Sequence, residues 1–73
     1  MYELRFHSET RRWRVYDGMK VLYPLHCGDP LLFELGGVFQ PTNIELDTEW
    51  YVAFGGTKFW LHTKTKYRVL LLQ

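Results

Sequence analysis

The sequence predicts an all-β protein that folds as a small barrel of five or six strands in a meander, with an N-terminal β-hairpin extension. Apolar and polar residues alternate with the period of two that is typical of strands, and no stretch has the periodicity of a helix. Glycine-containing pairs interrupt the apolar runs at Asp17-Gly18, Gly36-Gly37 and Gly55-Gly56, and such pairs tolerate the positive φ of tight hairpin turns. Closing short, curved strands into a barrel would remove exposed sheet edges.

The turn signals divide the 73 residues into seven strands and a last apolar stretch within one domain. We expect residues 1–21 to form the strand and hairpin extension and residues 22–73 to form the barrel. Pro41 lacks an N–H group and therefore indicates a bulge or a sheet edge. The expected strands are 2–7, 11–16, 19–23, 31–35, 38–46, 49–54 and 57–62, followed by the apolar stretch 67–72.

A two-residue loop at Gly55-Gly56 fixes the two faces of the strands around it, because a slip of one residue would exchange them. The reverse face then has Tyr51 directly opposite Trp60, with Lys58 and His62 nearby. The inner face collects five apolar side chains, namely Trp50, Val52, Phe54, Phe59 and Leu61.

The other turns are assigned by the same test. A three-residue loop over residues 47–49 sets Leu46 opposite Trp50, which keeps the apolar residues on one face. A two-residue loop at Gly36-Gly37 places Leu31, Phe33, Leu35 and Val38 together. In the first hairpin, a loop at Asp17-Gly18 groups Trp13 and Val15 with Lys20 and Leu22, so neither face is uniformly apolar.

Four segments occur in an order that resembles a known family. They are Leu25-His26-Cys27-Gly28-Asp29-Pro30, Pro41-Thr42-Asn43-Ile44-Glu45, Glu49-Trp50-Tyr51-Val52 and Tyr67-Arg68-Val69-Leu70. Over roughly residues 22–71 the chain resembles a small uncharacterised family from Gram-positive bacteria, their phages and mobile elements. The resemblance implies an SH3-like barrel but no activity or site. The chain departs from it in a longer, more basic extension from Tyr2 to Trp13.

No motif of catalysis or cofactor binding is present, and we expect neither an enzyme nor a cofactor. His26 and Cys27 are adjacent strand residues that would point to opposite faces, so we expect Cys27 to be a small buried apolar residue. His7, His26 and His62 lack the paired spacing of metal ligands. Asp29 is expected to fix a turn by accepting backbone N–H groups.

Charge is distributed unevenly although the net charge is only +1. Residues 1–20 carry +2, residues 21–57 carry −5 and residues 58–73 carry +4. If the two basic ends are neighbours, one positive surface would form from Arg11, Arg12, Arg14, Lys64, Lys66 and Arg68. Alternatively, basic end strands pair with acidic middle strands, through surface ion pairs that each contribute about 0–1 kcal/mol.

Tyr51 and Trp60 also allow alternative environments. If exposed, the pair could stack on bases, on a proline-rich peptide or on side chains of another protein. We favour instead that the N-terminal hairpin covers the pair as a second small core, with Tyr2, Leu4, Phe6 and Trp13 as its apolar residues. The same surplus of apolar residues could be buried in a homodimer.

Three functions follow, ranked in this order. The first is a non-catalytic interaction module, a protein-binding accessory or inhibitor protein of a bacterial phage or mobile element. The second is a nucleic-acid-binding barrel that combines the basic ends with Tyr51 or Trp60. The third is a small enzyme or metal protein. No apolar run is long enough to span a bilayer, so we expect a cytoplasmic protein without a membrane partner.

Overall fold

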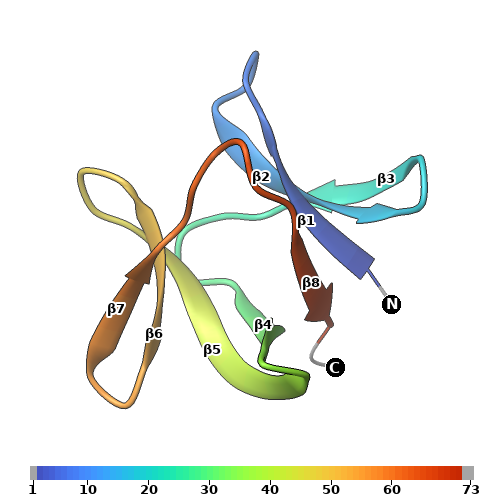
Figure 1. Ribbon diagram of the computed structural model, residues 1–73. Helices are drawn as coiled ribbons and strands as arrows, with labels where there is room; N and C mark the ends of the chain where they lie inside the picture. Colours follow the sequence, from blue (N-terminus) through green and yellow to red (C-terminus); the bar gives the residue numbers. More distant parts are fainter. Residues whose placement is uncertain (1, 72–73) are drawn as a thin grey trace.

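A computed structural model, which describes residues 2–71, has eight antiparallel strands in one sheet and no helix among the described residues. The all-β prediction is therefore confirmed. The strands are β1 (Tyr2–His7), β2 (Arg12–Asp17), β3 (Lys20–Pro24), β4 (Pro30–Leu35), β5 (Val38–Leu46), β6 (Trp50–Phe54), β7 (Thr57–Trp60) and β8 (Tyr67–Leu70) (Figure 1). Residue 72, which ends the last predicted stretch, lies outside the described residues.

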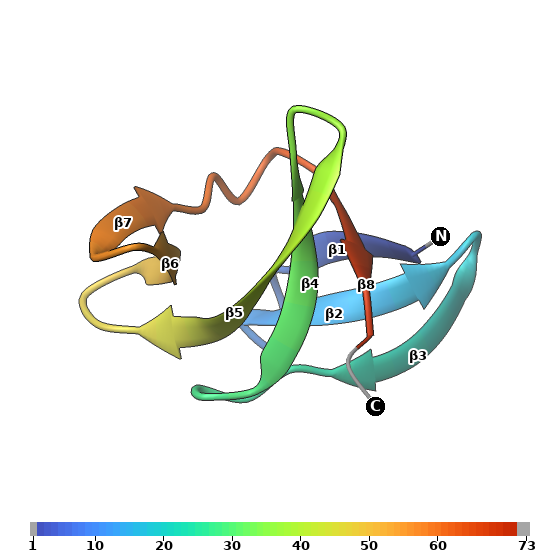
Figure 2. The ribbon, with the colours of Figure 1, turned by 90° about the horizontal axis from the view of Figure 1, so that it is seen from below.

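The sheet is open, so the closed barrel of five or six strands that we expected is not observed. Its strand order is β3-β2-β1-β8-β4-β5-β6-β7, with β3 and β7 at the two edges. The sheet stays open because β8 pairs with β4 on one side and with β1 on the other. The N-terminal hairpin therefore lengthens the sheet, and β4 and β5 cross over β1 and β2 as the sheet curls (Figure 2).

The concave side of the curled sheet holds a single core. The N-terminal hairpin supplies Leu4, Trp13 and Val15, which are fully buried. These side chains belong to the same cluster as the rest of the core, so the hypothesis that they cover Tyr51 and Trp60 is wrong. The buried apolar residues are Leu4, Trp13, Val15, Leu25, Leu31, Phe33, Ile44, Val52, Leu61 and Val69.

The predicted registers of the central hairpins are confirmed. Leu35 pairs with Val38 across Gly36-Gly37, and Leu46 pairs with Trp50 across the three-residue turn. Both glycines of the Gly36-Gly37 pair have positive φ. The ladder between β5 and β6 starts only at Ile44. In the described part of the chain, Pro41 therefore lies where β5 has no strand partner on that side, which fits the predicted edge.

The predicted register of the first hairpin is wrong. Asp17 pairs with Lys20, so the loop is Gly18-Met19, and a bulge between Val15 and Tyr16 shifts the pairing further along. Gly18 has positive φ and takes the first loop position, as a type II′ turn requires. Trp13 and Val15 on β2 are fully buried, and the shifted register sets Tyr23 opposite Val15.

The inner face of β6 and β7 follows the prediction except at its margin. Val52 and Leu61 are buried, and Trp50 is partly buried against the core. Phe59, which we expected in the core, is 38% exposed. Because β7 is an edge strand, no further strand among residues 2–71 covers that ring.

Candidate functional site

The convex face of the β6–β7 hairpin carries an aromatic cluster, which we define as Tyr51, Lys58 and Trp60. Tyr51 lies opposite Trp60 as predicted, with ring centroids 5.2 Å apart and an interplanar angle of 60°. The Lys58 Nζ atom lies 4.7 Å from the centroid of Tyr51 and 5.4 Å from that of Trp60. Trp60 is 40% exposed, so much of its ring area is available to a partner.

Acidic side chains border the aromatic cluster. Asp47 forms an ion pair with Lys58, with 3.7 Å between Oδ2 and Nζ. Glu45 is the β5 residue opposite Tyr51. The ion pair between Asp47 and Lys58 is one instance of the predicted alternative, in which basic and acidic segments neutralise each other locally. His62, predicted to lie near the rings, is exposed after β7, and its backbone N–H donates to Tyr67 Oη at 2.9 Å.

The basic ends of the chain meet on the convex face of β2, β1 and β8. Arg14 lies opposite Arg5, and Arg68 lies opposite Glu3. Arg5 donates from Nε to Glu3 Oε1 at 3.0 Å, and this hydrogen bond, together with the charges of Arg5, Lys66 and Arg68, lowers the pKa of the Glu3 carboxyl. Within residues 2–71, Arg14 and Arg68 have no acidic partner within 4.0 Å.

The other four basic residues of the predicted positive surface lie at turns or at strand ends. Arg11 and Arg12 border pockets between the β1–β2 turn and the β5–β6 turn, and Lys64 borders a third pocket beside Glu49. Arg12 is nevertheless the first residue of β2, two positions before Arg14, and Lys66 comes directly before β8, where its charge helps to lower the pKa of Glu3. Of the six residues, Arg11 and Lys64 therefore lie in turns, apart from Arg14 and Arg68 in the strands.

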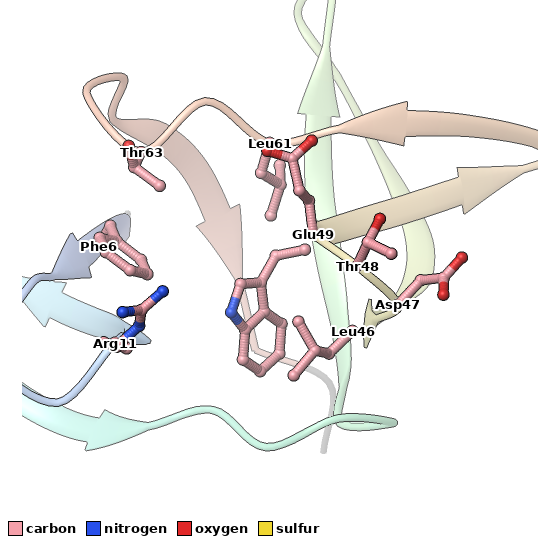
Figure 3. A pocket seen from close by; sticks show the side chains of 9 residues that line it. Phe6, Arg11, Leu46, Asp47, Thr48, Glu49, Leu61 and Thr63 are labelled. Atoms are coloured by element: carbon pink, nitrogen blue, oxygen red, sulfur yellow. The ribbon is translucent and has the colours of Figure 1, made fainter.

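The pocket between the two turns has a volume of about 460 Å³ and was not predicted. Phe6 and Arg11 form one wall and Leu46 the other, while the Asp47 carboxylate points away from Arg11 (Figure 3). Trp50 lines both this pocket and an adjoining one of about 400 Å³. The walls of the first pocket come from two regions far apart in the sequence. The one feature of the sequence that pointed to it was Trp50, at the end of the predicted inner face of β6.

The turn before β4 differs from the expectation at Cys27. This residue is exposed, because residues 25–29 form a turn and not a strand. Its Sγ donates to Glu45 Oε1 at 3.3 Å and accepts from the Leu46 N–H at 3.4 Å. Asp29 fixes the turn as predicted, since its Oδ2 accepts the His26 N–H at 2.8 Å.

These features define a small β protein with one curled sheet, an exposed aromatic cluster and a separate basic face. Residues 2–71 match the family model described as "Domain of unknown function (DUF5348)", and the chain belongs to this family. No curated protein and no solved structure matches the chain. Within residues 2–71, no helix is long and apolar enough to cross a membrane. The same residues contain no group of three or more His, Cys, Asp or Glu side chains placed to hold a metal ion.

Proposed function

We propose that this protein is a non-catalytic interaction module that binds another protein through the aromatic cluster of Tyr51, Lys58 and Trp60. As part of this proposal, it acts as an accessory or inhibitor protein of a bacterial phage or mobile element, with a sheet related to SH3-like barrels. The observation that carries the proposal is the exposed pair of rings on the face opposite the core. Tyrosine and tryptophan supply large contact areas with few rotatable bonds and are enriched at protein interfaces.

The charges around the aromatic cluster favour a protein over a nucleic acid as its partner. Glu45 and Asp47 border the rings and would repel phosphate groups. Arg14 and Arg68 lie on β2 and β8, and β4 and β5 separate those strands from β6 in the sheet. Base stacking and phosphate contacts would therefore fall on different parts of the sheet.

The test compares the wild-type protein with Trp60→Ala as immobilised baits in a bacterial lysate, with and without nuclease. Tyr23→Ala is the matched control, because Tyr23 is a similarly exposed aromatic residue on β3 at the other edge. We expect a protein that is captured by wild type and Tyr23→Ala, lost with Trp60→Ala and insensitive to nuclease. Capture that Trp60→Ala leaves unchanged would refute the proposed site.

Trp60→Ala must remain folded for that comparison, and the ring environment predicts that it does. An aromatic pair contributes about 0.5–1.5 kcal/mol beyond the area it buries, and Trp60 is only partly buried. We expect a loss of about 1–2 kcal/mol in the free energy of unfolding. Loss of several kcal/mol would identify the ring as core, in contradiction to its exposure.

A second candidate function, nucleic-acid binding, is favoured by the convex face where Arg14 and Arg68 have no acidic partner among residues 2–71. On single strands, the logarithm of affinity would fall with the logarithm of salt concentration with a slope of about −0.7 for each phosphate contacted. Fluorescence anisotropy with a labelled DNA oligonucleotide measures this slope. The double variant Arg14→Glu with Arg68→Glu should abolish binding, whereas Trp60→Ala should not if the basic face acts alone.

A further inference from the structure

The two edges of the open sheet are protected to different degrees. At the β3 edge, the strand carries Lys20 and Pro24, and its ladder with β2 is interrupted by a bulge between Val15 and Tyr16. These are features that prevent edge strands from pairing with other chains. The β7 edge has no proline and no bulge in its ladder with β6, and all four of its residues are exposed.

The backbone groups that β7 presents at its edge follow from its register with β6. Across the two-residue loop, Phe54 pairs with Thr57 and Val52 with Phe59. Pairs adjacent to such a loop and at every second position exchange both backbone hydrogen bonds. The Leu61 N–H, which donates to the Trp50 carbonyl at 3.0 Å, continues this alternation. The N–H and C=O groups of Lys58 and Trp60 therefore point away from β6.

We propose that β7 pairs in antiparallel fashion with β7 of a second copy of this chain, around a two-fold axis at Phe59. In this register Lys58 lies opposite Trp60 of the second copy, and the reverse pair is identical by symmetry. In each pair, both residues direct their N–H and C=O groups away from β6 of their own chain. The two pairs can therefore form four backbone hydrogen bonds between the copies. On the inner side, Phe59 lies opposite Phe59 of the second copy and covers a ring that is 38% exposed in the single chain.

Neighbouring registers that keep inner and outer faces together are less favourable. A shift of two residues in one direction sets Lys58 opposite Lys58 of the second copy, and like charges directly opposite are destabilising. A shift in the other direction sets Lys58 opposite His62, whose N–H already donates to Tyr67 Oη at 2.9 Å. The Phe59-centred register alone sets each Lys58 opposite a tryptophan of the second copy, and not opposite a lysine or a histidine.

The lysine does not protect the β7 edge as an edge lysine normally does. Its ammonium lies over the rings of Tyr51 and Trp60 and pairs with Asp47 at 3.7 Å, so it is drawn back over the sheet. A four-residue edge buries less than the roughly 1,000 Å² of a stable interface, so the dimer is weak and concentration-dependent. Pairing would place two aromatic clusters side by side on one continuous convex face, which goes beyond the proposed function of a single cluster.

Sedimentation velocity from micromolar to millimolar concentration tests whether the chain dimerises. Lys58→Pro removes an N–H group that points out of the sheet and keeps the ladder with β6, so it should abolish dimerisation while circular dichroism stays unchanged. Lys58→Ala retains the N–H and should still dimerise. A wild-type protein that stays monomeric throughout would overturn the proposal, and so would a dimer that Lys58→Pro leaves intact.

Disulfide trapping tests the register, in a Cys27→Ser background that removes the free thiol. Opposed residues that exchange no hydrogen bond lie about 4.5 Å apart at Cα, within the range of a disulfide. Phe59→Cys should therefore form a covalent dimer on mild oxidation. Thr57→Cys, on the same face but opposite Leu61 of the second copy, should not. Equal cross-linking at both positions would contradict the Phe59-centred pairing.

Discussion

Replacing Arg11 with glycine should stabilise the protein. Arg11 is the one non-glycine residue of the described chain 2–71 with positive φ, at 57°. It ends the β1–β2 turn, where its N–H donates to the His7 carbonyl at 2.8 Å. The left-handed conformation costs an ordinary residue about 1–2 kcal/mol, whereas glycine loses about 0.5–1 kcal/mol more entropy on folding. Arg11→Gly should therefore raise the free energy of unfolding by about 0.5–1 kcal/mol.

The matched control is Arg12→Gly, which removes the same charge from the adjacent exposed residue, where φ is not positive. Because Arg12 begins β2 and pairs with His7, glycine should lower the free energy of unfolding by about 0.5–1 kcal/mol. Urea denaturation followed by tryptophan fluorescence measures both changes. For a domain of this size the melting temperatures should differ from wild type by about 3–6 °C, in opposite directions. If both variants lose stability equally, conformational strain at Arg11 is not the dominant effect.

Three further changes test the core, a side-chain bridge and an ion pair. Trp13 is fully buried, and its Nε1 has no hydrogen-bond partner among the described residues. Trp13→Phe removes this unpaired donor and should change the free energy of unfolding by less than about 1 kcal/mol. Trp13→Ala should lose about 3–5 kcal/mol, and thermal denaturation measures both changes. Thr42→Val should cost about 1–2 kcal/mol in urea denaturation, because the Thr42 hydroxyl donates to the Ala53 carbonyl at 2.8 Å and accepts the Ala53 N–H at 3.2 Å. Because the pKa of Glu3 is lowered, its carboxylate stabilises the fold above the unfolded pKa, and this stabilisation is lost as pH falls through the folded pKa. The hydrogen bond from Arg5 is the main cause, and an NMR titration of Arg5→Gln should therefore show the Glu3 pKa rising toward its ordinary value.

The central hairpins could be predicted because their information is local. At Gly55-Gly56, both residues have positive φ, which only glycine adopts readily, and the alternation of apolar residues then allows one register. The first hairpin carries a similar signal, Asp17-Gly18, but Gly18 takes the first position of the loop and not the second. A glycine followed by an ordinary residue fits more than one turn type, and the bulge beside Val15 has no signature of its own.

The openness of the sheet could not be predicted, because it depends on pairing between the two ends of the chain. Nothing in the pattern of Tyr2–His7 specifies Tyr67–Leu70 as its partner, yet Tyr2 pairs with Val69 and Leu4 with Tyr67. The pattern does predict an apolar inner face for β1. It does not say whether that face covers the common core or a second one.

The candidate site divides along the same line between local and distant contacts. Tyr51 and Trp60 face each other across a short hairpin, so their pairing could be predicted from the turn alone. The pocket beside Trp50 is bordered by Phe6 and Leu46, which come from the ends of β1 and β5, and no sequence spacing relates them. The basic residues were predicted as one surface on the condition that the two ends of the chain are neighbours. The strands β1 and β8 do pair, but Arg11 lies at a turn while Arg14 lies inside a strand.

The exposure of the β7 hairpin follows from the partner that β8 takes. In a closed sheet the last strand of the meander would be covered, whereas here β1 occupies the free side of β8 and the hairpin β6–β7 remains at an edge. Phe59 and Trp60 are then both partly exposed, on opposite faces of the same strand. One pairing choice near the N-terminus thus produces both the aromatic cluster that we propose as a docking surface and the edge that we propose as a dimer contact. The two proposals can still fail separately, because Lys58→Pro and Lys58→Ala both remove the ammonium and differ in the edge N–H group, whereas Trp60→Ala acts on the ring.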